Sequence, residues 1–456
     1  DNISPDPNDE YLADGMTDEM ISKLSKIGNF RVIARTSVMR YKESAKSVAE
    51  IGEELSVGAL LEGSVRKVAN TLRINVQLVD VETQAPIWSK DYNRQLEDVF
   101  DIQDDVSRAI VEELKLTLSP REEQRLTERP IENIHAYESY IRARQAIAAF
   151  DVGAMQRALR EVQNALEIVG DNELLYSTMG WLYAHLVEAG VQTTEDYYEK
   201  AEELADKVFD LDPNSFYGYA LQGKIHNGRG NTQEAVRNLK RAYSIEPNNP
   251  DVLLQLSYNY IKSGNSAQAK LLLEKLLEID PLTPLNYNMR GLLDCMEGRF
   301  KLGLEYFSKG YDMDPESPGL RLFYAWFLAA NKRIDEACSV VDLLAKDSPQ
   351  TVLADLGLFF KHALRGEKEE ALQSLTPPLK AVATNVEYLA RVMADGFALI
   401  DDKERAIYWL ENSVNLGFIH YPYLAEYDPF LENVRGEESF QQLMQKVKYR
   451  WENFEI

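Results

Sequence analysis

Histidine, cysteine and carboxylate side chains are the groups of this chain that could hold a metal ion or transfer a proton. The histidines stand far apart in the sequence, at His135, His185, His226, His362 and His420. Metal sites usually take ligands at short, characteristic spacings, which neither these histidines nor the two cysteines, Cys295 and Cys338, provide. We therefore predict that the histidines pack between helices, and we predict no metal site and no cofactor.

Acidic residues near the amino terminus could instead serve acid–base chemistry or bind a cation. Asp14 and Asp18-Glu19 accompany an apolar pattern of helical spacing over residues 15–27. Carboxylates at the start of a helix accept hydrogen bonds from free amides and complement the helix dipole. We interpret these acids as a helix start, and we interpret a second acidic run over residues 97–105 in the same way. For the second run, an adaptor surface that binds a basic partner remains an alternative.

Catalytic motifs are missing from the sequence. It contains no Walker-type Gly-rich Lys loop, no nucleophile-elbow serine, no His-Glu metalloprotease pair and no zinc-spaced cysteine pair. The sequence therefore predicts no catalytic residues and a chain that is not itself an enzyme.

Composition limits the partners. The 456 residues are 45% hydrophobic and carry 50 basic against 74 acidic residues, a net charge of −24. An acidic surface disfavours direct nucleic-acid binding, which needs basic groups that neutralise phosphates. No run of 18 apolar residues is present, so we expect no membrane insertion by this chain. The start at Asp1 leads us to expect a fragment with an anchor or effector domain upstream, and leaves cytoplasm and periplasm both open.

Prolines recur with a constant period through the second half of the chain. They are separated by 34 residues and four of them follow an acidic residue, at Pro213, Pro247, Pro281, Pro315 and Pro349. Proline cannot continue a helix, so each one marks a boundary between helical hairpins. A fixed period of this length is typical of a stacked-repeat protein.

Small residues keep the same period inside the repeats. One slot is occupied by Gly223, Ser257, Gly291 and Ala325, and a second slot by Ala235, Ala269, Gly303, Ala337 and Ala371. Small side chains let the two helices of a hairpin approach closely, while large apolar residues fill the space between hairpins, at Leu239, Leu273, Phe307, Val341 and Leu375. The stretch YALQGKIHNGRGNTQEAVRNLKRAYSIEPNN closely resembles the consensus of the tetratricopeptide repeat family.

That resemblance implies an all-α superhelix. We expect about eight hairpins over residues 133–417, a linker helix over 120–132 and a carboxy-terminal cap over 418–456 that covers the last apolar face. In this family the first helix of each hairpin lines a concave inner face. The register places eleven residues there: Lys224, Leu254, Tyr258, Ile261, Asn288, Leu292, Met296, Leu322, Trp326, Leu356 and Phe360.

This inner face becomes more apolar from Lys224 towards Trp326 and Phe360. A large apolar stripe normally marks a binding surface, so we expect it to hold a protein or peptide partner. The alternative is that the chain itself buries it, through a tightly wound superhelix or through the carboxy-terminal tail, with Tyr421, Tyr423 and Phe430 as candidate side chains.

The first 119 residues lack the period and predict a small α/β domain with a mixed sheet. A short buried strand is predicted over residues 30–34, and three further strands are predicted over residues 59–68, 72–81 and 86–92. Ser47 and Glu50 have the spacing of a capping box. The stretches EYLADGMTDEMISKLSKIGNFRVIARTSVMRYK and IGEELSVGALLEGSVRKVANTLRINVQLVDVETQAPIWSKDYNRQLEDVF resemble the TolB amino-terminal-like, FlgO-related domain. Relatives begin with an apolar strand just before Asn2, so we expect one strand to be missing.

The paired resemblance implies a role in bacterial signalling. Such a domain followed by tetratricopeptide repeats occurs after adenylate or guanylate cyclase domains, serine/threonine kinase domains and CadC-like regulators. We therefore expect a regulatory, protein-binding scaffold, with a cell-envelope assembly factor or chaperone-type adaptor as the alternative. A homo-oligomer is compatible with either.

Overall fold

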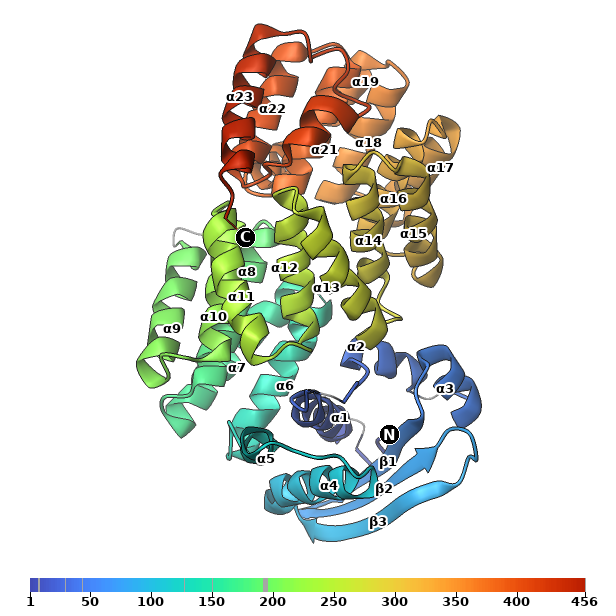
Figure 1. The fold of residues 1–456 in the computed structure, drawn as a ribbon, viewed down its shortest axis with the longest axis vertical. Helices are drawn as coiled ribbons and strands as arrows, with labels where there is room; N and C mark the ends of the chain where they lie inside the picture. The colour runs from blue at the N-terminus through green and yellow to red at the C-terminus, as the bar shows by residue number, and fades with distance from the viewer. Residues whose placement is uncertain are drawn as a thin grey trace.

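A computed structural model describes residues 1–6, 9–28, 30–42, 44–126, 128–149, 151–191 and 196–455. Figure 1 shows a small α/β domain at one end of the molecule and a long all-helical array above it. The predicted order of a small α/β domain followed by an all-helical superhelix is confirmed. None of the described helices is both long enough and apolar enough to cross a bilayer.

The α/β domain contains one antiparallel sheet in the order β1-β2-β3, formed by β1 (Ala59–Val68), β2 (Thr71–Asp80) and β3 (Pro86–Gln95). Alternate residues of the central strand are buried, as their period-2 pattern predicts: Leu72, Ile74, Val76 and Leu78. In the described part of the chain, parallel pairing is confined to a single bridge between Asn2 and Val65 at the β1 edge.

The domain also contains short and long helices. They are α1 (Glu10–Ser25), α2 (Arg35–Val38), η2 (Met39–Tyr41), α3 (Val48–Leu55), η3 (Leu96–Asp98), α4 (Val99–Glu113) and α5 (Pro120–Leu126). The capping box before α3 is confirmed, since Ser47 N donates to Glu50 Oε2 at 2.7 Å and Glu50 N donates to Ser47 Oγ at 3.3 Å. Helix α5 lies in the region expected to link the domain to the repeats.

Two local predictions for this domain are wrong. Residues 30–34 form no strand, and Ala34 N donates to Ile279 O in the repeat array at 2.7 Å. Helix α1 begins at Glu10, because Leu12 and Ala13 extend its buried face towards the amino terminus. Asp14 is therefore inside the helix rather than at its start, and it accepts hydrogen bonds from Lys42 Nζ at 2.6 Å and Gln145 Nε2 at 2.9 Å.

Helices of the array pair in chain order. The pairs are α6 (Ile134–Ala149) with α7 (Val152–Val169), α8 (Glu173–Glu188) with α9 (Tyr197–Leu211), α10 (Phe216–Gly228) with α11 (Thr232–Ile245), α12 (Pro250–Lys262) with α13 (Ser266–Ile279), α14 (Pro284–Met296) with α15 (Phe300–Met313), α16 (Pro318–Ala330) with α17 (Ile334–Asp347), α18 (Val352–Leu364) with α19 (Lys368–Gln373) and α20 (Pro377–Ala383), and α21 (Glu387–Leu399) with α22 (Lys403–Asn415). The π-helical turn η4 (Tyr423–Tyr427) and α23 (Glu438–Glu452) follow.

The periodic residues explain this geometry. Gly230, Gly264 and Gly298 turn three successive hairpins with φ near +75°, a backbone region that favours glycine. A Cβ on Gly291 would lie 2.5 Å from Phe307 Cδ2, so the small slot of the first helix packs directly against the large residue of the second. The close approach predicted from residue size is confirmed at this hairpin.

The array curls back so that its carboxy-terminal end reaches its earlier hairpins. Thr232 Oγ1 donates to Gly417 O at 2.9 Å, and Ile419 N donates to Lys262 O at 2.9 Å. Figure 1 shows α21 to α23 stacked over the ends of α11 and α12. The inner face of this turn is therefore enclosed by segments far apart in sequence.

The α/β domain shares an apolar core with α6 to α9 and also docks on later turns of the array through polar contacts. The buried Asp280 carboxylate accepts hydrogen bonds from Thr36 Oγ1 and Ser37 Oγ, each at 2.6 Å. Arg40 donates to Leu282 O at 3.0 Å and to Met313 O at 2.9 Å. These contacts join two successive hairpin boundaries, at Pro281 and Pro315, to one short segment of the domain.

Candidate functional site

The residues predicted to line the inner face lie on the first helices of successive hairpins, from α10 to α18. Two of the eleven, Leu254 and Tyr258, are half-buried. The other nine are buried: Lys224, Ile261, Asn288, Leu292, Met296, Leu322, Trp326, Leu356 and Phe360. The surface that the repeat register predicts is thus brought together, and most of it is covered.

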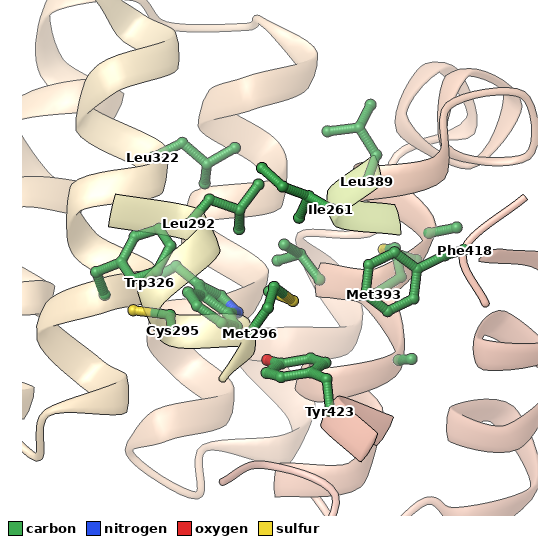
Figure 2. Close-up of a cluster of buried hydrophobic side chains, with 14 of the residues drawn as sticks. Ile261, Leu292, Cys295, Met296, Leu322, Trp326, Leu389, Met393, Phe418 and Tyr423 are labelled. Carbon is green, nitrogen blue, oxygen red and sulfur yellow. The ribbon is translucent and has the colours of Figure 1, made fainter. Parts of the chain in front are cut away.

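Helix α21 and the carboxy-terminal segment cover the apolar part of this face. Figure 2 shows Leu292, Met296 and Trp326 from the repeats facing Met393, Phe418 and Tyr423 across the interior. The Phe430 ring meets Trp326 edge-to-face at 5.5 Å between centroids, and Phe360 at 5.4 Å. Edge-to-face pairs add to the free energy gained by burying the rings.

The sequence leaves two occupants open for this part of the face, a partner or the chain itself. In the structure, the chain's own tail lies against Trp326 and Phe360. Phe430 and Tyr423 are buried there, whereas Tyr421 lies outside against Trp451, 5.8 Å between ring centroids. The partner-binding role of the eleven residues stays a prediction.

Buried charged groups secure this closure. Trp326 Nε1 donates to Asp395 Oδ2 at 2.8 Å, and Tyr258 donates its hydroxyl proton to the Glu387 carboxylate. Burial and the nearby Asp428 carboxylate raise the pKa of Asp395 well above its usual value, although the Trp326 hydrogen bond and Arg391 oppose the shift. The interior beside Trp326 thus contains a carboxyl group that favours its protonated form.

The polar end of the face has its own ion pair. Lys224 Nζ donates to Glu188 Oε1 at 2.6 Å and lies 5.6 Å from the centre of the Trp181 ring. Burial alone would raise the pKa of Glu188, but Lys224 and His185 outweigh it and lower that pKa to about 2. Lys224 is therefore held by the chain rather than free for a partner.

The histidines do not converge. His362 Nδ1 lies 2.6 Å from Glu367 Oε2, and the buried His420 Nδ1 accepts a hydrogen bond from Tyr423 N. Burial lowers the pKa of His420 to about 4, so it is neutral at pH 7. Among the described residues, no three His, Cys, Asp or Glu side chains are grouped as metal ligands.

Outside the predicted face, two of the cavities formed by the described residues are lined in part by helix α1. One, of about 590 Å³, runs along the free edge of β1 between largely apolar side chains of α1 and residues 30–33. It begins where residues 1–3 pair with β1, Ile3 N donating to Val65 O at 2.9 Å. The other, of about 160 Å³, lies between α1 and the inner side of the first hairpins.

Sequence reasoning missed the smaller cavity. Its charged residues come from distant parts of the chain, at Asp18, Glu19, Arg35, Arg144, Glu246 and Asp251. They share no motif or period, so no signal in the sequence could have grouped them. Asp18 and Glu19 of α1 lie at this candidate site instead of capping a helix.

Comparison with known proteins identifies the repeats. Residues 227–290 and 296–357 match the tetratricopeptide repeat family. The all-helical array is therefore a tetratricopeptide-repeat array, a fold that mediates protein–protein interaction. The likeness covers the repeats and does not extend to the α/β domain, whose TolB-like assignment stays a prediction.

Curated relatives match parts of the chain. "Putative adenylate cyclase 3" of Rhizobium meliloti (strain 1021) is 36% identical over 225 residues, covering 48% of this chain and 38% of that protein. "Type IV pilus assembly protein PilF" of Pseudomonas aeruginosa is 33% identical over 87 residues, covering 19% of this chain and 34% of that protein. The chain thus spans less than two fifths of the length of these relatives.

Among solved structures, a tetratricopeptide repeat protein from Parabacteroides merdae ATCC 43184 covers 68% of this chain and 99% of its own, with 15% identity and a TM-score of 0.37. PilF of Pseudomonas aeruginosa covers 44% of this chain and 88% of its own, with 18% identity and a TM-score of 0.35.

Proposed function

We propose that this chain is a non-catalytic regulatory module of a bacterial signalling protein, which binds a protein partner and passes its state to an effector domain. The observation that carries the proposal is the 36% identity to a putative adenylate cyclase over 48% of the chain. The resemblance of the first 119 residues to TolB-like domains, which accompany repeats in cyclases and kinases, supports the same role.

The docked domains suit such a role mechanically. Asp280 is hydrogen-bonded to Thr36 and Ser37 and so ties a turn of the repeats to the α/β domain. A partner that shifts the hairpins would therefore shift the domain as well. Coupling of this kind needs a partner with different affinities for the two arrangements.

The inner face would bind the partner where the chain leaves it accessible. Leu254 and Tyr258 on α12 are half-buried, and they adjoin the polar end at Lys224. The apolar end around Trp326 holds the tail and stabilises the turn. We place a peptide-like partner segment against α12.

Affinity capture from the source bacterium tests the proposal, with this chain as bait and captured proteins identified by mass spectrometry. Leu254→Asp should lose the partner while its circular dichroism stays unchanged, because a charge now faces the partner's apolar segment. Leu271→Asp is the matched control, since Leu271 is 61% exposed on the outer helix α13. Equal capture by wild type and Leu254→Asp would reject the inner face as the site.

The identity of the captured protein separates this proposal from its alternative. The PilF match, 33% identical over 87 residues, keeps an envelope-assembly adaptor open. A captured signalling enzyme or regulator supports the proposed function. A captured pilus or envelope-assembly component supports the alternative.

A further inference from the structure

The smaller cavity is formed by both parts of the molecule. Helix α1 and residues 32–35 of the α/β domain line one side, and α6, α8, α10 and the start of α12 line the other. Its volume of about 160 Å³ resembles that of an engineered protein cavity that binds benzene. It therefore has room for a molecule of about six non-hydrogen atoms.

Charges around the cavity favour a cation. The lining contains four carboxylates, at Asp18, Glu19, Glu246 and Asp251, and two guanidinium groups, at Arg35 and Arg144, so it carries a net charge of 2 − 4 = −2. An anionic guest would add to this excess of negative charge, whereas a cationic guest would offset it.

The carboxylates are only partly neutralised by their neighbours. Arg144 approaches Asp251 at 3.4 Å and Arg35 approaches Asp18 at 3.9 Å, both longer than a good charge-assisted hydrogen bond. Lys23 lies 4.0 Å from Glu19 and instead donates to Asp104.

Two of these acids are held away from water. Burial raises the pKa of Glu19 and of Glu246, against the opposing effects of Lys23 and Lys26. An ammonium group beside them would compensate the lost hydration.

Aromatic rings complete the wall. Tyr140, Trp181 and Tyr217 line the cavity, and ring faces attract cations and alkyl groups alike. The Trp181 ring already lies near one cation, the Lys224 ammonium. Acidic groups combined with aromatic faces are the chemistry by which proteins recognise amines.

We propose that this cavity binds a small free organic cation, an alkylamine or diamine of about six non-hydrogen atoms. Its ammonium group lies against the carboxylates of Glu19 and Asp251, and its alkyl part lies against Tyr140 and Tyr217. The repeats thereby acquire a small-molecule input whose lining includes none of the eleven inner-face residues, although it adjoins that face at Trp181, beside Lys224.

Binding would strengthen the docking of the two domains. They meet beside the cavity through Asn248, which donates to Ser25 O at 3.2 Å, and a guest would touch both sides at once. A ligand that binds the docked form alone stabilises that form by mass action. The regulatory consequence rests on the proposed function, whereas the binding does not.

Isothermal titration of the purified full chain with putrescine, up to about 10 mM, tests the site, because ligands of this size commonly bind in the micromolar to millimolar range. The isosteric neutral 1,4-butanediol and the dianion succinate are the comparison compounds. We expect saturable heat and a rise in melting temperature with putrescine and neither effect with the other two. Absence of saturable putrescine binding, or equal binding of butanediol, would overturn the proposal.

Two isosteric variants locate the binding. Glu19→Gln and Asp251→Asn should each raise the Kd for putrescine about tenfold or more, since each removes a charge-assisted contact. Glu167→Gln, an exposed position on α7, is the matched control and should leave the Kd unchanged. An unchanged Kd in both cavity variants, with their circular dichroism intact, would place putrescine elsewhere and refute the assignment.

One further compound distinguishes a free amine from a protein-borne lysine. The tripeptide Gly-Lys-Gly carries the same ammonium on a bulkier backbone, so it should bind more weakly than putrescine; equal or tighter binding would overturn the free-cation assignment. Failure of putrescine to bind, combined with capture of a signalling partner by the repeats, would reject this inference and leave the proposed function standing.

Discussion

Replacing Phe430 by alanine measures how far the tail belongs to the folded core. Phe430 is 7% exposed and its ring contacts both Trp326 and Phe360. Truncating a buried phenylalanine costs about 3–5 kcal/mol, because apolar area is lost and a cavity remains. Two edge-to-face pairs, each worth about 0.5–1.5 kcal/mol, are lost with it.

We therefore expect Phe430→Ala to lower the free energy of unfolding by about 4 kcal/mol. Urea unfolding, followed by circular dichroism and by Trp fluorescence, measures this free energy. Coincident transitions from the two probes would show that unfolding is two-state, as the calculation requires. Tyr449→Ala on α23 is the matched aromatic control. Its side chain is 70% exposed, so it should change stability by less than about 0.5 kcal/mol.

A loss below about 1 kcal/mol for Phe430→Ala would refute this reasoning. It would mean that the tail rests loosely on the inner face and leaves Trp326 and Phe360 available. In that case hydrogen exchange in α16 and α18 should be as fast in wild type as in the variant. A large loss, in contrast, means that a partner must bind elsewhere on the face.

Three further changes test other parts of the structure. Asp280→Ala removes the buried acceptor of two hydroxyl groups from the α/β domain and should cost about 2–3 kcal/mol, read as faster proteolysis between the domain and the array. Gly291→Ala places a Cβ 2.5 Å from Phe307 and should cost about 1–3 kcal/mol in urea unfolding. Burial and Asp428 raise the pKa of Asp395, so the native state binds its proton more tightly than the unfolded state does. This contribution to stability is complete below the ordinary aspartate pKa of about 4 and is lost as the pH rises through the raised value. Asp395→Asn should therefore flatten the decline of melting temperature with pH, as a thermal scan from pH 4 to 9 would show; an unchanged decline would exclude this carboxyl.

Local structure followed closely from local sequence. The helices before Pro213, Pro247 and Pro281 end at Leu211, Ile245 and Ile279, because proline stops a helix whatever surrounds it. The capping box at Ser47 is equally local, since donor and acceptor are three residues apart.

Predictions failed where a distant segment decides the outcome. Residues 30–34 have the composition of a buried strand, yet their partner is Ile279 in the array rather than a strand of the sheet. Asp14 has the residue type of a helix cap, yet its carboxylate accepts hydrogen bonds from Lys42 of the α/β domain and from Gln145 of α6. The type of a residue indicates whether its side chain is buried, but it does not indicate which element of the fold covers that side chain.

The sequence by itself determined the repeat period, the pairing of helices and the set of residues that share the inner face. These follow from helix geometry and hairpin turns, which act over a few tens of residues. The tertiary structure alone decided that Phe430 meets Trp326 and that the acids near residue 18 face Arg144 and Asp251. Each hairpin adds a small rotation, and the sum over the array brings its carboxy-terminal segment back onto α11 and α12, so no single repeat encodes which surfaces stay open.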